Sequence, residues 1–182
     1  MLGNLRKSYI LRKQGHISLG LFGRFPESFK EQITTDWAMG FFFVVRKSII
    51  NKYGIKWDEK LISYAYAEDL DFSYRYCKYA KNDGYKCIIT DKVIVNHRVS
   101  KEWRETSRAV TFMEIFHREY FTYKWKLSLF SRLCTRWANL GTLFLRLVKW
   151  NHPLDVLKAQ FYCDWYRHDI RIGNLHTDLY WK

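Results

Sequence analysis

Three carboxylates within four residues form the cluster of the sequence best suited to chemistry. Glu68, Asp69 and Asp71 stand at the start of a segment, 67–81, whose spacing predicts a helix. Such a cluster can supply a general base or hold a divalent cation. A purely structural role is the alternative, because the helix dipole favours acids in a first turn. Glu68 and Asp69 would point about 100° apart on a helix, which argues against a facing glycosidase pair.

Two further positions have side chains suited to ligand binding. His97 follows the β-prone run Val93–Val95, and ligands of α/β folds bind at strand ends, where imidazole is a common metal ligand. An ordinary, partly buried histidine is the alternative. Trp37 and Gly40 precede the apolar run Phe41–Val45. This glycine would let the backbone approach a ligand and the indole could stack on a sugar, although a turn with a buried tryptophan explains the same residues.

Short strands alternating with helices are expected around these residues, between positions 36 and 100. The expected elements are a buried strand over Phe41–Val45, a helix over Lys47–Tyr53 stopped by Gly54, a helix over Ala67–Lys81, and short β-prone runs over Tyr85–Ile89 and Val93–Val95. A basic, loop-rich lead-in over 1–35 precedes them. The middle of the chain therefore predicts a mixed α/β structure.

Residues 101–182 predict aromatic-rich, basic helices. One apolar stripe contains Phe112, Phe116, Tyr120 and Tyr123, and a second contains Leu129, Leu133, Trp137, Leu140, Phe144 and Leu147. A last helix is expected from Pro153 to about Arg171, with Gly173 after it. The stripes either pack against the rest of the protein or lie on a membrane surface, where Trp, Tyr, Lys and Arg are favoured.

Composition limits the possible classes of protein. The chain has 182 residues, 48% of them hydrophobic and 19% aromatic, so it can form a core and is not a disordered tail. Lys and Arg number 31 against 18 Asp and Glu, a net charge of +13 that favours an anionic partner. No run of 18 apolar residues and no export signal are found. We therefore expect a cytoplasmic protein, peripheral at most to the inner face of a membrane, with its four cysteines reduced.

The segments of the middle zone, taken in order, resemble the C-terminal half of a family-2 glycosyltransferase of the GT-A type. The resemblance is carried by Trp37–Gly40, the Phe41 run ending in Arg46, Tyr53–Leu61, Glu68–Arg75, Gly84–Lys86 and Val93–His97. It implies an α/β fold, a partial GT-A-like mixed sheet with flanking helices, followed by a C-terminal helical segment. The implied domains are the lead-in 1–35, an acceptor-side half of the catalytic domain over 36–100, and a helical extension over 101–182.

The resemblance also implies roles for individual residues. Asp69 corresponds to the general base that deprotonates the acceptor hydroxyl, with inversion at the sugar carbon. The implied binding residues are Glu68, Trp37 and Gly40 for the acceptor, Asp71 and Arg75 for the donor, and His97 for a divalent metal ion, Mg²⁺ or Mn²⁺. The implied substrates are a nucleotide-sugar donor and a saccharide or lipid-linked acceptor, as in the assembly of surface polysaccharide or glycolipid.

The nucleotide-binding half of the family is missing from the sequence. Such enzymes begin with a βαβ half that ends in an Asp-x-Asp motif, whereas the 35 residues before Asp36 contain neither feature. The chain is therefore expected to be a truncated or partial enzyme, or one that works with a partner chain. The alternative is a non-catalytic basic module that binds nucleic acid or a membrane surface. Nucleic acid is disfavoured because acids interleave with the basic residues and no RNP-like motif occurs.

Overall fold

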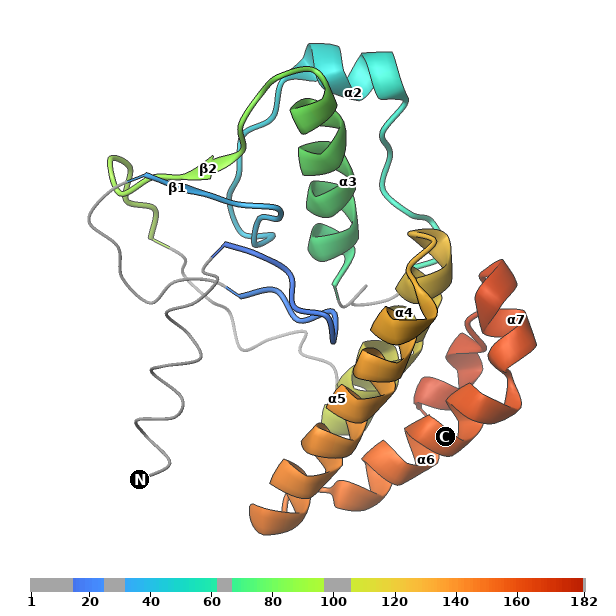
Figure 1. Cartoon of the computed structure of the whole chain (residues 1–182). Coiled ribbons are helices and arrows are strands. Elements are labelled where there is room, and N and C mark those ends of the chain that lie inside the picture. The colour runs from blue at the N-terminus through green and yellow to red at the C-terminus, as the bar shows by residue number, and fades with distance from the viewer. Residues whose placement is uncertain (1–14, 25–31, 62–66, 97–105, 182) are drawn as a thin grey trace. The chain divides into compact units, whose positions relative to one another are not determined.

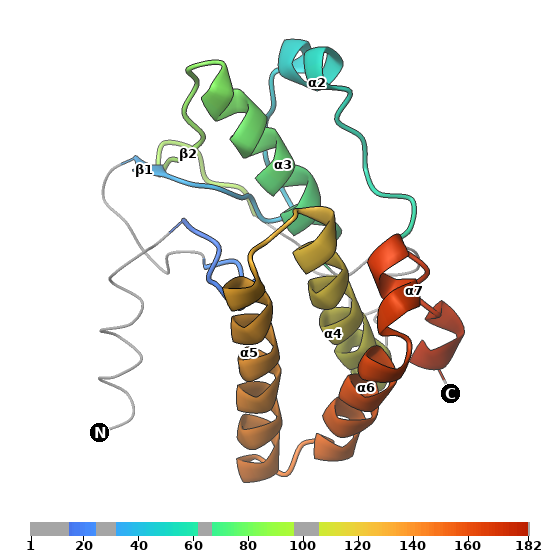
Figure 2. The ribbon, with the colours of Figure 1, turned by 45° about the vertical axis from the view of Figure 1, so that its right-hand side comes forward.

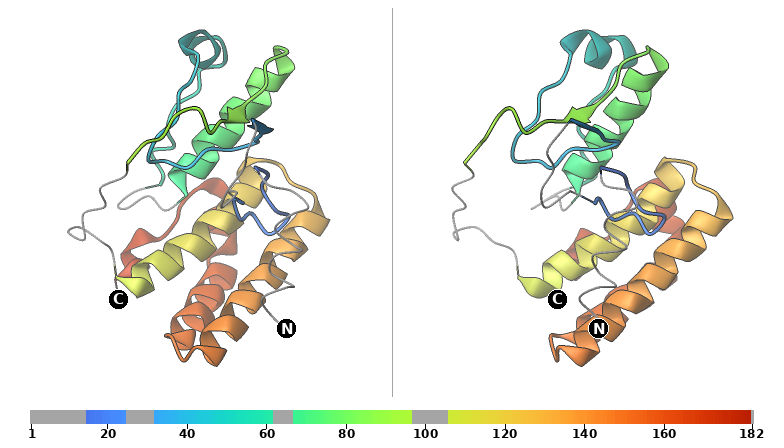
Figure 3. Two further views of the ribbon diagram at one scale, coloured as in Figure 1. Left: turned by 90° about the vertical axis from the view of Figure 1, so that its left-hand side faces the viewer. Right: turned by 60° about the vertical axis from the view of Figure 1, so that its left-hand side comes forward.

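The predicted mixed sheet is not present in the part of the chain that the structure describes. The structure is a computed structural model that describes residues 15–24, 32–61, 67–96 and 106–181, and its elements are drawn in Figure 1. Helices hold 57% of these residues and strands 4%. Their only sheet is an antiparallel pair, β1 (Ile33–Thr34) and β2 (Ile88–Ile89), which lie side by side in both views of Figure 3. The predicted α/β fold with a GT-A-like mixed sheet is therefore wrong.

Two apolar runs account for this correction. Phe41–Val45 was expected to be a buried strand, but it lies outside any strand and Val44 is 82% exposed. Val93–Val95 likewise forms no strand, and Ile94 is 88% exposed. β-branched and aromatic residues favour a strand only where a neighbouring strand accepts and donates the backbone hydrogen bonds. The sequence of a run does not show whether such a neighbour exists.

The chain divides into two compact units. Unit 1 contains Met1–Ser18, Phe22–Asp58 and Glu68–Val99, and unit 2 contains Leu19–Leu21, Glu59–Ala67 and Ser100–Lys182. The division expected from the sequence, at positions 35 and 100, stays a prediction.

Two helices and the short sheet form unit 1. Helix α2 (Lys47–Tyr53) ends at Gly54, whose φ of 59° is the left-handed conformation that glycine adopts without strain. Helix α3 (Glu68–Asn82) has its three acids in the first turn. Both helices were predicted from the sequence. They enclose a core of buried side chains, namely Ile49, Ile55, Phe72, Tyr76 and Ala80.

Unit 2 is a group of helices around α4 (Ser107–Lys124). Helices α5 (Leu129–Val148), α6 (Pro153–Trp165) and α7 (Arg167–Ile172) and the 3-10 helix η1 (Thr177–Tyr180) pack against α4, and Figure 2 shows α5 and α6 joined by a short turn. Three residues of the predicted stripe of α4 are buried, since Phe112 and Phe116 are fully enclosed beside Tyr180 and Tyr120 is also in the core. The fourth, Tyr123, is half-buried. The expected last helix is interrupted at Tyr166 and gives α6 and α7.

Helix α5 has its apolar side outward. Its buried residues are the polar Thr135 and Asn139. Its exposed side chains include Leu129, Phe130, Leu133, Trp137, Leu140, Phe144, Leu147 and Val148, which we call the apolar face. None of the described helices combines the length and apolar character needed to cross a membrane.

Candidate functional site

One side of α3 lies along the loop that precedes Phe41. Asp69 and Ser73 are four residues apart and therefore share a helix face. The Ser73 hydroxyl accepts a hydrogen bond from Ala38 N at 2.8 Å and donates to Asp69 O at 2.6 Å. The structure thus brings together the two segments, 37–40 and 68–71, that the sequence singled out.

The Asp69 carboxylate is held by two backbone amides. Its Oδ2 accepts a hydrogen bond from Gly40 N at 2.8 Å, and its Oδ1 accepts one from Leu70 N at 2.8 Å. A Cβ atom on Gly40 would lie 3.0 Å from Asp69 Cβ and 3.2 Å from Oδ2. The missing side chain of Gly40 therefore permits this close approach. Each carboxylate oxygen keeps a second lone pair, so a further proton donor can still be bound.

Glu68 is next to Asp69 but differs from it in surroundings. Its side chain is exposed, and no hydrogen bond fixes it among the described residues. The pKa of Glu68 is raised, first by partial loss of water around the carboxylate and second by the negative charge of Asp69. A raised pKa lets Glu68 exchange a proton at a higher pH than an isolated glutamate.

Asp71 and Arg75, the predicted donor-binding pair, contact each other inside unit 1. The Asp71 side chain is 1% exposed, and its Oδ2 accepts hydrogen bonds from Arg75 Nε at 3.0 Å and from Nη2 at 2.7 Å. Arg75 Nη2 also donates to Lys56 O at 2.6 Å. These contacts link the backbone at Lys56 to helix α3 and serve a structural role. Donor binding by either residue stays a prediction.

Trp37 is buried rather than presented to solvent. Its indole packs on Gly23, where an added Cβ would lie 2.5 Å from the ring. Its backbone N donates to the hydroxyl of the buried Thr35 at 3.2 Å. This geometry fits the turn with a buried tryptophan that the sequence left open. Stacking of the indole on an acceptor sugar stays a prediction.

The expected metal site has no counterpart among the described residues. His97, the predicted ligand, lies outside them. Within them, no three His, Cys, Asp or Glu side chains gather in a way that could hold a metal ion. Binding of Mg²⁺ or Mn²⁺ by this chain stays a prediction.

Two contacts in unit 1 were not predicted from the sequence. His16 Nδ1 is hydrogen-bonded to Asp36 Oδ2, although His16 lies in no recognisable ligand spacing in the sequence. Cys77 of α3 and Cys87 share a thiol hydrogen bond and pack on the same core. Each pair is separated by ten or more residues and lies in no known motif, so no local sequence signal identifies it.

Protein-family models, curated proteins and solved structures were compared with the chain, and none of them matches it.

Proposed function

We propose that unit 1 carries the acceptor side of a sugar-transfer site, with Asp69 as the general base. The reaction is transfer of a hexose from a nucleotide-diphosphate donor to a hydroxyl of a saccharide or lipid-linked acceptor, with inversion at the sugar carbon. The proposal rests on the resemblance of residues 36–100 to family-2 glycosyltransferases. The observation that carries it is the 2.8 Å hydrogen bond from Gly40 N to Asp69 Oδ2.

That hydrogen bond supports a reactive role because it fixes the carboxylate without neutralising it. A sugar hydroxyl becomes a good nucleophile only when a positioned base removes its proton. Two backbone amides orient Asp69, and the described residues place no cation against it. Glu68, with its raised pKa, is suited to hold a proton beside it.

The experiment measures release of nucleoside diphosphate by the full chain. UDP-, GDP- and dTDP-hexoses are incubated with Mg²⁺ or Mn²⁺ and with saccharide or lipid-linked acceptors. We expect release from at least one donor, reduced at least a hundredfold by Asp69→Asn, because general-base catalysis contributes about 10²–10⁴-fold. Ser73→Ala is the matched control, since it breaks the Ala38–Ser73 hydrogen bond on the same helix face but keeps the carboxylate.

The two variants distinguish the base from a structural anchor. Loss of turnover in Asp69→Asn alone supports the base. Equal losses in both variants would mean that turnover requires only the packing of the 37–40 loop against α3. No release from any donor, with the wild-type chain folded, would count against sugar transfer by this chain without a partner chain.

A second function is favoured by the outward apolar side of α5: unit 2 binds the anionic surface of a membrane. The inner side of α5 is held by polar contacts, because Arg136 forms ion pairs with Asp164 of α6 and with Glu119 of α4. Asn139 donates to Gln160 Oε1 at 2.9 Å. The helix is therefore anchored through its polar side and presents Leu, Phe and Trp outward.

Both attractive forces of an interfacial helix are available here. Burial of a Leu or Phe side chain contributes about 1.5–3 kcal/mol, and α5 exposes several along one line, at Leu133, Trp137, Leu140, Phe144 and Leu147. Each nearby Lys or Arg adds about 1 kcal/mol at an anionic surface. Cations flank the apolar face at Arg132, Arg146 and Lys149. These charges favour anionic lipid of the inner, cytoplasmic face over zwitterionic lipid.

Vesicle sedimentation tests this second function. We expect the chain to bind vesicles of phosphatidylcholine with phosphatidylglycerol more tightly than phosphatidylcholine alone. Trp137→Gln with Phe144→Gln should weaken that binding at least tenfold. The control pair is Phe42→Gln with Ile94→Gln, which removes exposed apolar side chains of unit 1 and should change nothing. Equal effects of the two pairs would show that binding follows total apolar surface and not α5.

A further inference from the structure

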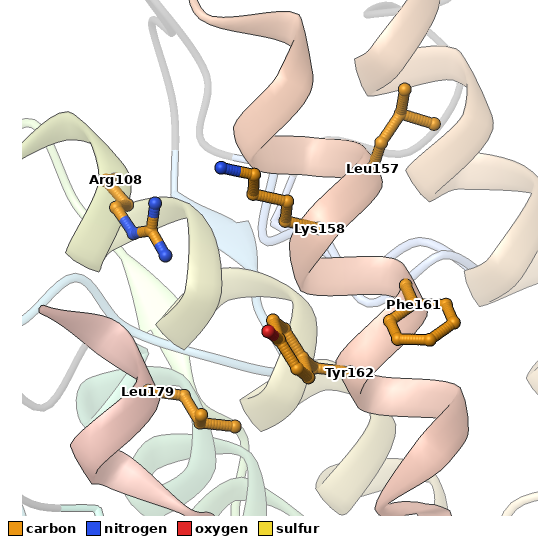
Figure 4. Close-up of a pocket in the computed structure, with 6 residues that line it drawn as sticks. All are labelled: Arg108, Leu157, Lys158, Phe161, Tyr162 and Leu179. Carbon is orange, nitrogen blue, oxygen red and sulfur yellow. The ribbon is translucent and has the colours of Figure 1, made fainter. Parts of the chain in front are cut away.

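A cavity of about 430 Å³ opens in unit 2 beside helix α6. It is lined by Arg108, Leu157, Lys158, Phe161, Tyr162 and Leu179. Figure 4 shows the Lys158 side chain reaching from α6 toward Arg108 of α4, with Tyr162 and Leu179 below them. The volume falls within the range of about 300–1,000 Å³ that small-molecule sites occupy.

The two cations at this cavity can donate further hydrogen bonds. Arg108 Nε is buried and makes no hydrogen bond within the described residues. The Arg108 guanidinium lies 5.1 Å from the centre of the Phe112 ring, which holds it in place. Its nearest acid is Asp155, with Nη1 and Oδ1 3.9 Å apart, beyond hydrogen-bond distance. No described acid forms an ion pair with Lys158. Two cations facing one acid leave a net positive charge at the cavity.

Apolar side chains run from the cavity along α6. Leu154, Leu157, Phe161 and Trp165 are exposed and recur at steps of three or four, so they lie on one helix face. Lys158 stands at the edge of this stripe. In Figure 4, Leu157 and Phe161 leave the helix on the side away from Arg108. A ligand reaching across Lys158 would therefore meet positive charge at one end and an apolar surface at the other.

We propose that the cavity binds the phosphate of an anionic amphiphile, with its apolar chain along the exposed stripe of α6. The inference rests on the proposed membrane binding of unit 2 and deepens it by naming the headgroup chemistry. Arg108 supplies paired N–H donors that match phosphate oxygens, and Lys158 supplies a second positive charge. The Tyr162 hydroxyl lines the same cavity and can donate a third hydrogen bond.

The test measures binding of dodecyl phosphate, below its micelle concentration, to the full chain by calorimetry. We expect Arg108→Gln and Lys158→Gln each to weaken binding about tenfold or more. Lys126→Gln is the matched control, because it removes an exposed cation just after α4 that does not line the cavity, and it should change affinity less than twofold. Lys158 is exposed, so its variant is expected to fold even if Arg108→Gln does not.

Inorganic phosphate distinguishes the source of the headgroup. We expect it to bind at least tenfold more weakly than dodecyl phosphate and to compete with it. Equal affinity for both would overturn the amphiphile and indicate a site for free phosphate. Equal loss in all three variants would overturn the cavity, since it would show a response to net charge alone.

The same variants separate this inference from the membrane proposal. If Trp137→Gln with Phe144→Gln leaves vesicle binding unchanged while Lys158→Gln weakens dodecyl phosphate binding, the membrane role of α5 fails and the cavity stands. If vesicle binding needs the apolar face but dodecyl phosphate binding ignores Arg108 and Lys158, the cavity fails and the membrane role stands.

Discussion

The outward apolar side of helix α5 predicts that substitution of an arginine destabilises the protein more than substitution of the neighbouring tryptophan. Arg136 and Trp137 are neighbours in the sequence, yet Arg136 contacts Asp164 and Glu119 whereas Trp137 is 77% exposed. We expect Arg136→Met to destabilise unit 2 and Trp137→Gln to leave its stability unchanged. In a helix with its apolar side buried, the tryptophan would be the sensitive position.

The magnitudes follow from the contacts that each change removes. Arg136→Met keeps the length of the side chain but removes a hydrogen bond to Asp164 and the positive charge beside Glu119, whose side chain is 3% exposed. A hydrogen bond between charged groups contributes about 1.5–3 kcal/mol, and the partial exposure of Arg136 and Asp164 reduces this. We expect a loss of about 2 kcal/mol. An exposed substitution such as Trp137→Gln should stay within about 0.5 kcal/mol.

Urea unfolding, followed by helical circular dichroism in the absence of lipid, measures both changes. With a slope of about 1–3 kcal/mol per molar urea, Arg136→Met should lower the midpoint by about 1 M, and Trp137→Gln should leave it in place. Removal of a buried tryptophan typically costs about 3–5 kcal/mol. A loss of that size in Trp137→Gln, with little effect of Arg136→Met, would refute the outward orientation of α5 and with it the membrane proposal.

Three other predictions concern single contacts. The pKa of Cys87 is lowered by the hydrogen bond from the Cys77 thiol, and the pKa of Cys77 is raised. Iodoacetamide at neutral pH should therefore label Cys87 before Cys77, as measured by peptide mass mapping. Faster labelling of Cys77 would contradict this. Burial raises the pKa of Asp164, but hydrogen bonds from Arg167, Gln160 and Arg136 outweigh it and the net pKa is lowered. Acid that protonates this carboxylate therefore removes stabilising interactions. Melting temperature should therefore fall below about pH 4, and less steeply in Asp164→Asn; equal slopes would count against the ion pairs. Gly40→Ala should lower the free energy of unfolding in urea by about 1 kcal/mol, because the added Cβ would contact Asp69. Gly141→Ala, whose Cβ would contact nothing within 4 Å, should instead stabilise α5 by about 0.5–1 kcal/mol. No effect of Gly40→Ala would argue against the close approach of Gly40 and Asp69.

Helices were predictable from this sequence where local signals agree. The segment Lys47–Tyr53 is followed by a glycine in the left-handed conformation, and α3 has acids first and a lysine in its last turn. The stripe of α4 matches its buried side. In each case the interactions that favour the helix act between residues only a few positions apart in the sequence.

The strands and the side of burial were not predictable, because they depend on distant partners. Phe41–Val45 has strand propensity but no strand partner in the described part of the chain. The stripe of α5 has the same spacing as that of α4 but faces outward, since polar contacts through Arg136 and Asn139 hold its other side. For the candidate site, the sequence indicated Asp69 and Gly40 separately. Their hydrogen bond forms only when the fold brings the two segments together.

The Asp71–Arg75 pair limits how this sequence can change in evolution. The Asp71 side chain is 1% exposed, and removal of one partner from a buried ion pair typically costs about 3–5 kcal/mol. Replacement of both by well-packed apolar residues is often nearly neutral. Substitution at the two positions is therefore expected to be concerted, and diverged copies of this chain should retain both charges or neither.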